Sequence, residues 1–196
     1  FLKEPFSAKT LGADMISVSG HKVHAPKGIG ALYIRQGVKL PAHILGGGQE
    51  DGLRSGTENV CGIAGMGAAA EERAQNMSSD CETVTALRER LISALPDGVS
   101  VNQPLGEYLP NIVSLHVPGI KSEVLVRHMS ANGVCISAGS ACHQGKASHV
   151  VSALGLDKRT ANGVLRISFG PETTFAEIDA LYEALLRHKN TRFPML

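Results

Sequence analysis

The sequence predicts an α/β fold, because segments with the pattern of strands alternate with segments with the pattern of helices. A chain of 196 residues is long enough to bury a core without disulfide or metal crosslinks. Glycine accounts for 22 of the 196 residues, a larger share than the average usage of about 7%. This excess indicates turns and close backbone contacts. Collagen-like, coiled-coil and disordered chains are excluded by this composition.

The first part of the chain is expected to hold two strands and a helix. The apolar run 15–18 predicts a buried strand, and 28–34 predicts a second one after a turn at Pro26. A helix is expected over 57–76. It contains three glycines, each of which weakens a helix by roughly 1 kcal/mol relative to Ala, so we expect tight packing against another backbone. These glycines are Gly62, Gly65 and Gly67.

A second, smaller domain is expected to follow. Ser79 and Glu82 form a capping-box pattern ahead of apolar residues at helical spacing, which predicts the start of a new helix. The expected boundary therefore divides the chain into 1–76 and 77–196.

The second domain is expected to alternate strands and helices. The strands are expected at 113–117, 134–136 and 164–169, and the helices at 123–130 and 149–154. A second capping-box pattern, Thr174 with Glu177, predicts the start of the last helix.

Charge and cysteine content narrow the function classes. The 19 basic and 18 acidic side chains leave a formal net charge of +1, so we expect no nucleic-acid or membrane-surface partner. No apolar run approaches the roughly 20 residues that span a bilayer, and no signal-peptide pattern is seen. The four cysteines form no CxxC pair, which favours a reduced, cytoplasmic protein whose cysteines act as thiols.

The segment Ser19-Gly20-His21-Lys22 is the first candidate site. A lysine directly after a buried strand lies where α/β sheets bind ligands, and burial favours the neutral, nucleophilic amine. Pyridoxal phosphate is the cofactor that most often uses such a lysine, with Ser19 and His21 as phosphate or ring contacts. The alternative is an exposed lysine at a strand end, with Ser19 as a cap.

The glycine-rich segment 46–59 is the second candidate. Glycines followed by the hydroxyl of Thr57 at a helix N-terminus can bind an anion through backbone N–H groups. The segment is not a Walker A loop, because no Lys-Ser or Lys-Thr follows the last glycine. A plain connector with Thr57 as an ordinary N-cap is the open alternative.

Cys142 is the third candidate, because it lies in a run of small and polar residues where a thiol is accessible. His143 and Lys146 would favour its reactive thiolate form. The alternative is an unreactive loop cysteine. Cys135, in contrast, is expected to be a buried strand residue.

Arg166 is the fourth candidate, because it places a charge inside the apolar strand 164–169. A buried guanidinium is rarely left unpaired, and its planar fork suits a carboxylate. Either an internal Asp or Glu or the carboxylate of a substrate would satisfy it.

In this order, the motifs resemble the cysteine desulfurase family, the NifS/IscS-type enzymes that are class V aminotransferase-like and use pyridoxal 5'-phosphate (PLP). The resemblance extends over essentially the whole chain, and its segments are 19–22 with 26–28, 46–59, 137–142 with 148–150, and 165–170. It implies the PLP-dependent transferase fold type I, which is aspartate-aminotransferase-like, in a homodimer. Residues 1–76 would be part of the large cofactor-binding domain, and 77–196 the small C-terminal domain with the catalytic cysteine loop.

The resemblance also implies roles for the residues near the cofactor. Lys22 would attach PLP covalently and move protons during catalysis. Ser19 and His21 would bind the phosphate, with His21 also part of the catalytic set. Thr57 would reach the phosphate of the cofactor in the neighbouring subunit.

The implied reaction converts L-cysteine to L-alanine. Arg166 would bind the substrate carboxylate, and Cys142 would take the sulfur as a persulfide. A sulfur-acceptor protein, either an iron–sulfur scaffold or a thiolation protein, would then receive it. No metal is expected.

The sequence departs from the family at its start. The family's acidic partner of the pyridine nitrogen and its ring-stacking His precede the lysine motif, whereas nothing before Lys22 matches them. Since the chain begins at Phe1 without an initiator Met, we expect it to be the C-terminal part of a larger enzyme. Two alternatives remain open: a selenocysteine lyase, and a non-catalytic fragment that relays sulfur through Cys142.

Overall fold

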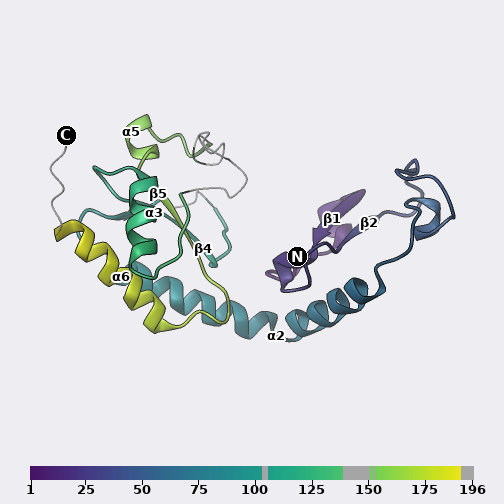
Figure 1. Cartoon of the computed structure of the whole chain (residues 1–196), viewed down its shortest axis with the longest axis horizontal. Coiled ribbons are helices and arrows are strands. Elements are labelled where there is room, and N and C mark those ends of the chain that lie inside the picture. Colours follow the sequence, from purple (N-terminus) through teal and green to yellow (C-terminus); the bar gives the residue numbers. More distant parts are fainter. Residues whose placement is uncertain (103–105, 139–150, 152, 191–196) are drawn as a thin grey trace. The chain divides into compact units, whose positions relative to one another are not determined.

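Figure 1 shows the computed structural model of the chain, which describes residues 1–102, 106–138, 151 and 153–190. The chain forms two compact units, Phe1–Ser78 and Ser79–Leu196, and each is described by itself. Among the described residues, no helix is both long and apolar enough to cross a lipid bilayer.

The first unit holds a two-stranded antiparallel sheet. Strand β1 (Met15–Ser19) pairs with β2 (Gly30–Ile34) in a register that places Ser19 opposite Gly30. Both expected strands are therefore present. However, β1 is not buried: its residues alternate between exposed and half-buried, because β2 is its only sheet neighbour among the described residues. The other elements are α1 (Ala8–Leu11), η1 (Gly20–Val23), η2 (Glu50–Gly52) and the first part of α2 (Val60–Ser93).

Helix α2 is continuous, so the expected break near residue 76 is wrong. Ser79 and Glu82 lie inside the helix and do not start a new one. The physical reason is local composition: the stretch 68–93 contains no glycine or proline, and a Ser-x-x-Glu pattern alone does not stop a helix that good helix formers continue. The two compact units therefore meet within α2.

The second unit is built on a three-stranded antiparallel sheet. Its strands are β3 (Ser100–Val101), β4 (Ile112–His116) and β5 (Val164–Ser168), in the order β3-β4-β5. The short β3 has no signal in the sequence pattern. The helices are the end of α2 with α3 (Ser122–Ala131), α5 (Lys158–Ala161) and α6 (Phe175–Asn190) (Figure 1).

The core of this unit lies between the sheet and the helices α2, α3 and α6. Leu115 of β4 and Leu165 of β5 are opposite each other and fully buried. The helices contribute further fully buried side chains, which are Leu87, Leu91, Leu125 and Met129. Successive strand residues point to opposite faces, so the residues flanking Leu115 and Leu165 lie on the face away from this core.

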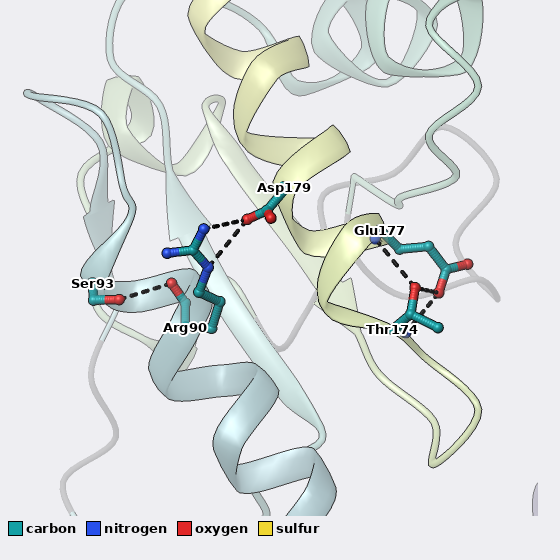
Figure 2. Close-up of polar contacts among 5 residues, drawn as sticks. All are labelled: Arg90, Ser93, Thr174, Glu177 and Asp179. Atoms are coloured by element: carbon teal, nitrogen blue, oxygen red, sulfur yellow. Dashed lines mark hydrogen bonds and ion pairs between the residues drawn. The ribbon is translucent and has the colours of Figure 1, made fainter.

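The predicted capping box at the start of α6 is confirmed (Figure 2). The Thr174 backbone N donates to Glu177 Oε2 at 2.7 Å, and the Glu177 backbone N donates to Thr174 Oγ1 at 3.3 Å. The backbone and side-chain hydrogen bonds from Thr174 lower the pKa of Glu177. Helix α6 is also tied to α2, because Arg90 Nε and Nη2 donate to Asp179 Oδ1 at 3.1 and 2.6 Å.

The segment after α3 differs from its prediction. Residues 134–136 form no strand. Of the described residues that follow α3, Ser137 alone bridges to β5, through two backbone hydrogen bonds with Arg166 of 3.2 and 2.7 Å. Val134 and Ile136 pack against the core, whereas Cys135 is exposed. The prediction of a buried Cys135 is therefore wrong, because the alternating pattern places its two apolar neighbours inward. The helix expected at 149–154 lies largely outside the described residues.

Candidate functional site

Lys22 lies in η1, in the turn that directly follows β1. Gly20 and Val23 are buried and anchor this turn, while the side chains of His21 and Lys22 are exposed. Gly20 donates its backbone N–H to Ile29 O at 2.9 Å. A Cβ at Gly20 would lie 2.9 Å from Ile29 Cγ2, so the turn can pack this closely only with glycine. The sequence thus fixes the backbone that carries the lysine.

The side chains of Ser19, His21 and Lys22 are not used by the rest of the described chain. Lys22 is exposed, so the expectation of a buried lysine is wrong; its cause is the half-exposed β1 that leads into the turn. Ser19 occupies the N-cap position of η1 but makes no capping hydrogen bond with its side chain. Among the described residues, the side chains of Ser19, His21 and Lys22 make no hydrogen bond or ion pair. A hydroxyl, an imidazole and an amine are therefore available to a ligand.

The stretch of chain that contains the turn is rich in positive charge. The stretch 15–49 contains no Asp or Glu, whereas it contains three lysines and one arginine. Arg35 Nη2 pairs with Asp14 Oδ1 at 2.5 Å. Within the part of the chain that the structure describes, Lys22, Lys27 and Lys39 make no ion pair. This excess of uncompensated positive charge favours an anionic ligand.

Near its N-terminal end, α2 packs through Gly65 against Pro26, which follows the lysine turn in the chain. A Cβ at Gly65 would lie 2.9 Å from Pro26 Cγ and 3.1 Å from Pro26 Cδ. Tight packing against another backbone was expected for all three helix glycines; Gly65 does pack tightly, but against the ring of Pro26 and not against a backbone. Gly62 instead faces the side chain of Asn59, and a Cβ at Gly67 would meet nothing within 4 Å. Only Gly65 therefore has a packing reason that involves the lysine segment.

Thr57 is not the N-cap of α2. The cap is Asn59, whose Oδ1 accepts a hydrogen bond from Gly62 N at 3.1 Å, and the helix starts at Val60. Thr57 is exposed, and over the described residues its side chain makes no hydrogen bond. The interpretation of Thr57 as an ordinary cap is therefore wrong, and its hydroxyl is available to an anion. Its neighbour Asn59 has the asparagine type that N-caps prefer, which is the signal that could have located the cap.

Arg166 lies in β5 of the second unit and is half-buried. Its Nε is buried and has no hydrogen-bond partner within the described part of the chain. Among the described residues, no carboxylate pairs with this guanidinium. The sequence alone slightly favours an internal salt bridge over a substrate carboxylate, whereas no Asp or Glu of the described part of the chain pairs with Arg166. A buried donor without an acceptor costs stability unless a ligand satisfies it.

Arg166 belongs to a row of polar residues that the sequence analysis missed. In register, Asn102, Ser114, Arg166 and Ser137 are consecutive neighbours across the sheet. Asn102 Nδ2 donates to Ser114 Oγ at 3.0 Å. The available signal was the alternation of Ser114 with the apolar Val113 and Leu115, which places it on the face away from the core.

Cys142 lies outside the described residues. The described cysteines, Cys61, Cys81 and Cys135, are free and exposed. Within the described ranges, no group of three or more His, Cys, Asp or Glu side chains could hold a metal ion.

Known proteins resemble the chain in sequence and in fold. The family described as Aminotransferase class-V matches residues 1–181. A cysteine desulfurase of Nostoc sp. (strain PCC 7120 / SAG 25.82 / UTEX 2576) is 42% identical over 189 residues, which cover 93% of this chain and 47% of the relative. The NifS-like protein from Rickettsia africae ESF-5 has a TM-score of 0.88 at 30% identity, covering 97% of this chain and 51% of that one. Another NifS-like protein has a TM-score of 0.85 at 38% identity, covering 95% and 49% of the two chains.

These similarities confirm two predictions from the sequence. The α/β fold is that of the NifS-like proteins, as the PLP-dependent transferase fold type I predicted. The resemblance to NifS/IscS-type cysteine desulfurases is confirmed by curated relatives of that name. The chain spans about half the length of the curated relatives it matches. By its match over residues 1–181, the chain belongs to the aminotransferase class-V family.

Proposed function

We propose that the complete natural polypeptide carrying this chain is a cysteine desulfurase, which uses PLP to convert L-cysteine to L-alanine. The observation that carries this proposal is the exposed Lys22 at the end of β1, with the unused side chains of Ser19 and His21 beside it in sequence. Curated relatives named cysteine desulfurase support the choice of substrate.

The residues of the lysine turn fit PLP. The amine of Lys22 makes no hydrogen bond or ion pair within the described chain. A free lysine amine is the group that the aldehyde of the cofactor requires. The hydroxyl of Ser19, the imidazole of His21 and the acid-free stretch 15–49 suit its phosphate. Thr57 of the partner subunit would add another hydroxyl in a homodimer. When bound, the cofactor supplies an electron sink for carbanion chemistry.

The chain's own residues would then act on the substrate. Lys22, displaced from the cofactor by the substrate amine, would take the proton from the substrate Cα and return it to carbon. Arg166 would bind the substrate carboxylate, and its unpaired Nε fits a carboxylate oxygen as the missing acceptor.

Sulfur transfer would take place at Cys142. Its thiolate attacks the substrate sulfur, so that a new S–S bond forms while the bond between that sulfur and the substrate Cβ breaks. The electron pair of the broken bond stays with the substrate carbon, which gains a proton and becomes the methyl group of alanine. The product on the enzyme is a persulfide, which an acceptor protein for iron–sulfur or thio-cofactor assembly would receive in the cytoplasm.

The test measures alanine and sulfide release from L-cysteine by the complete polypeptide with PLP. We expect Cys142→Ala to keep the bound cofactor and lose sulfur release. Cys135→Ala is the matched control, because Cys135 is also a free thiol and is exposed, and it should keep full turnover. Absence of alanine formation by the unmodified polypeptide, or normal turnover by Cys142→Ala, would contradict the proposal. Exclusive turnover of selenocysteine would identify a selenocysteine lyase instead.

A further inference from the structure

The sheet face around Arg166 has an unusual composition for the surroundings of a cation. The in-register neighbours of Arg166 on this face are Ser114 on β4 and Ser137 at the isolated bridge, with Asn102 one strand further. All three are uncharged. Directly opposite residues in an antiparallel pair have Cβ atoms about 5 Å apart, so Ser114 is the closest side-chain position to Arg166 on the central strand.

The Asn102–Ser114 pair is ordered by two hydrogen bonds. The Asn102 backbone N donates to Ser114 O at 2.8 Å, which continues the β3–β4 ladder. The Asn102 side chain donates from Nδ2 to Ser114 Oγ at 3.0 Å. Both residues are half-buried. The amide therefore fixes the Ser114 hydroxyl next to the arginine position, although neither side chain supplies an acceptor to Arg166 Nε.

We infer that Asn102 and Ser114 are positioning residues for Arg166, and that their neutral, hydrogen-bonded pair keeps the guanidinium in place and unpaired for the substrate carboxylate. This inference rests on the proposed role of Arg166. A carboxylate at the Ser114 position would pair with Arg166 and compete with the substrate. Neutral dipoles at the same place pack beside the cation without neutralising it.

If the polar residues of this face were merely exposed to solvent, substrate binding would not depend on the hydroxyl or the charge at position 114. The distinction can be tested at Ser114 with a pair of nearly isosteric variants. Ser114→Thr keeps the hydroxyl and Ser114→Val removes it, while both suit a β-strand. Ser100 provides the charge control, because it lies on the same face of β3 but opposite His116 instead of Ser114.

The experiment measures kcat and KM for L-cysteine with the complete polypeptide loaded with PLP. We expect Ser114→Val and Asn102→Ala to raise KM about 3- to 10-fold, the effect of one lost hydrogen bond, with kcat within about twofold. Ser114→Thr should keep the wild-type KM. Ser114→Asp should raise KM more than Ser114→Val does, and added salt should partly reverse this rise. Ser100→Asp, which adds the same charge, should leave KM unchanged.

The outcomes separate this inference from the proposed function. Arg166→Gln must raise KM strongly, and if it does not, the proposed role of Arg166 fails and the inference falls with it. If Arg166→Gln raises KM while Ser114→Val and Ser114→Asp match the wild type, the proposed function stands and the inference is overturned. A rise in KM for Ser100→Asp equal to that for Ser114→Asp would also overturn it, because the effect would then be one of net charge on the face. Thermal unfolding midpoints of all variants identify any that fail to fold; if Ser114→Val is one of them, the KM of Asn102→Ala decides the case, and a wild-type value overturns the inference.

Discussion

The two glycines Gly65 and Gly67 provide a sharp test of how α2 supports the lysine turn. Both lie in the helix interior, where replacement by alanine stabilises a helix by about 1 kcal/mol. At Gly67 the added Cβ meets nothing within 4 Å. At Gly65 it would lie 2.9 Å from Pro26 Cγ, closer than real Cβ atoms approach, and the rigid proline ring cannot rotate away. Overpacking of this kind costs about 1–3 kcal/mol.

The expected results therefore differ in sign. Gly67→Ala should raise the free energy of unfolding by about 1 kcal/mol. Gly65→Ala should leave it unchanged or lower it by up to about 2 kcal/mol, and should also weaken PLP binding, because Pro26 follows the Lys22 turn closely. Urea unfolding of both variants, with cofactor absorbance as the second readout, measures the difference. Equal stabilisation by the two substitutions would refute the packing of α2 against Pro26.

Two further predictions concern the second unit. Because the pKa of Glu177 lies below its ordinary value of 4.5 in the folded chain, its capping interaction should contribute stability above that pH and lose it as the pH falls through the lowered pKa. Urea unfolding should therefore show Glu177→Gln less stable than wild type at pH 7, with the gap closing in acid; a gap that persists at low pH, or an equal loss in Glu183→Gln on the same helix, would contradict this. Leu115 has no exposed surface and belongs to the core of the second unit. Leu115→Ala leaves a cavity there and should lower the free energy of unfolding by about 3–5 kcal/mol. A loss below about 1 kcal/mol in the same assay would contradict the assigned core.

Local patterns in the sequence predict much of the fold of the second unit. The capping box of Thr174 and Glu177 specifies the start of α6 because its hydrogen bonds are made within four residues. The alternation around Ser114 specifies β4 in a similarly local way, because its apolar neighbours Val113 and Leu115 both point into the same core. Patterns of this kind are complete within their own segment, and they are therefore predictable.

The errors arise where a local pattern competes with its context. Ser79 has the signature of an N-cap, but the flanking residues continue α2 through it. Cys135 sits among strand-forming residues, yet its exposure depends on which neighbours the core takes up. The exposure of Lys22 reflects the two-stranded sheet that β1 forms with β2, and no residue type in the turn specifies the number of strands in that sheet.

The candidate site shows the same division. The chemistry of Lys22, Thr57 and Arg166 is predictable from residue type and motif order. The unused hydroxyl of Thr57 and the unpaired Nε of Arg166 emerge only from the structure. The row that joins Arg166 to Ser114 depends on strand register, which pairs residues more than 50 positions apart in the sequence.

The central claim is that Lys22 attaches the cofactor. The most direct measurement is peptide mapping by mass spectrometry after the complete polypeptide is incubated with PLP and reduced with borohydride. The account predicts one phosphopyridoxyl group, on Lys22, which Lys22→Ala loses and Lys27→Ala retains. An adduct on other lysines, or an unchanged adduct yield in Lys22→Ala, would contradict it.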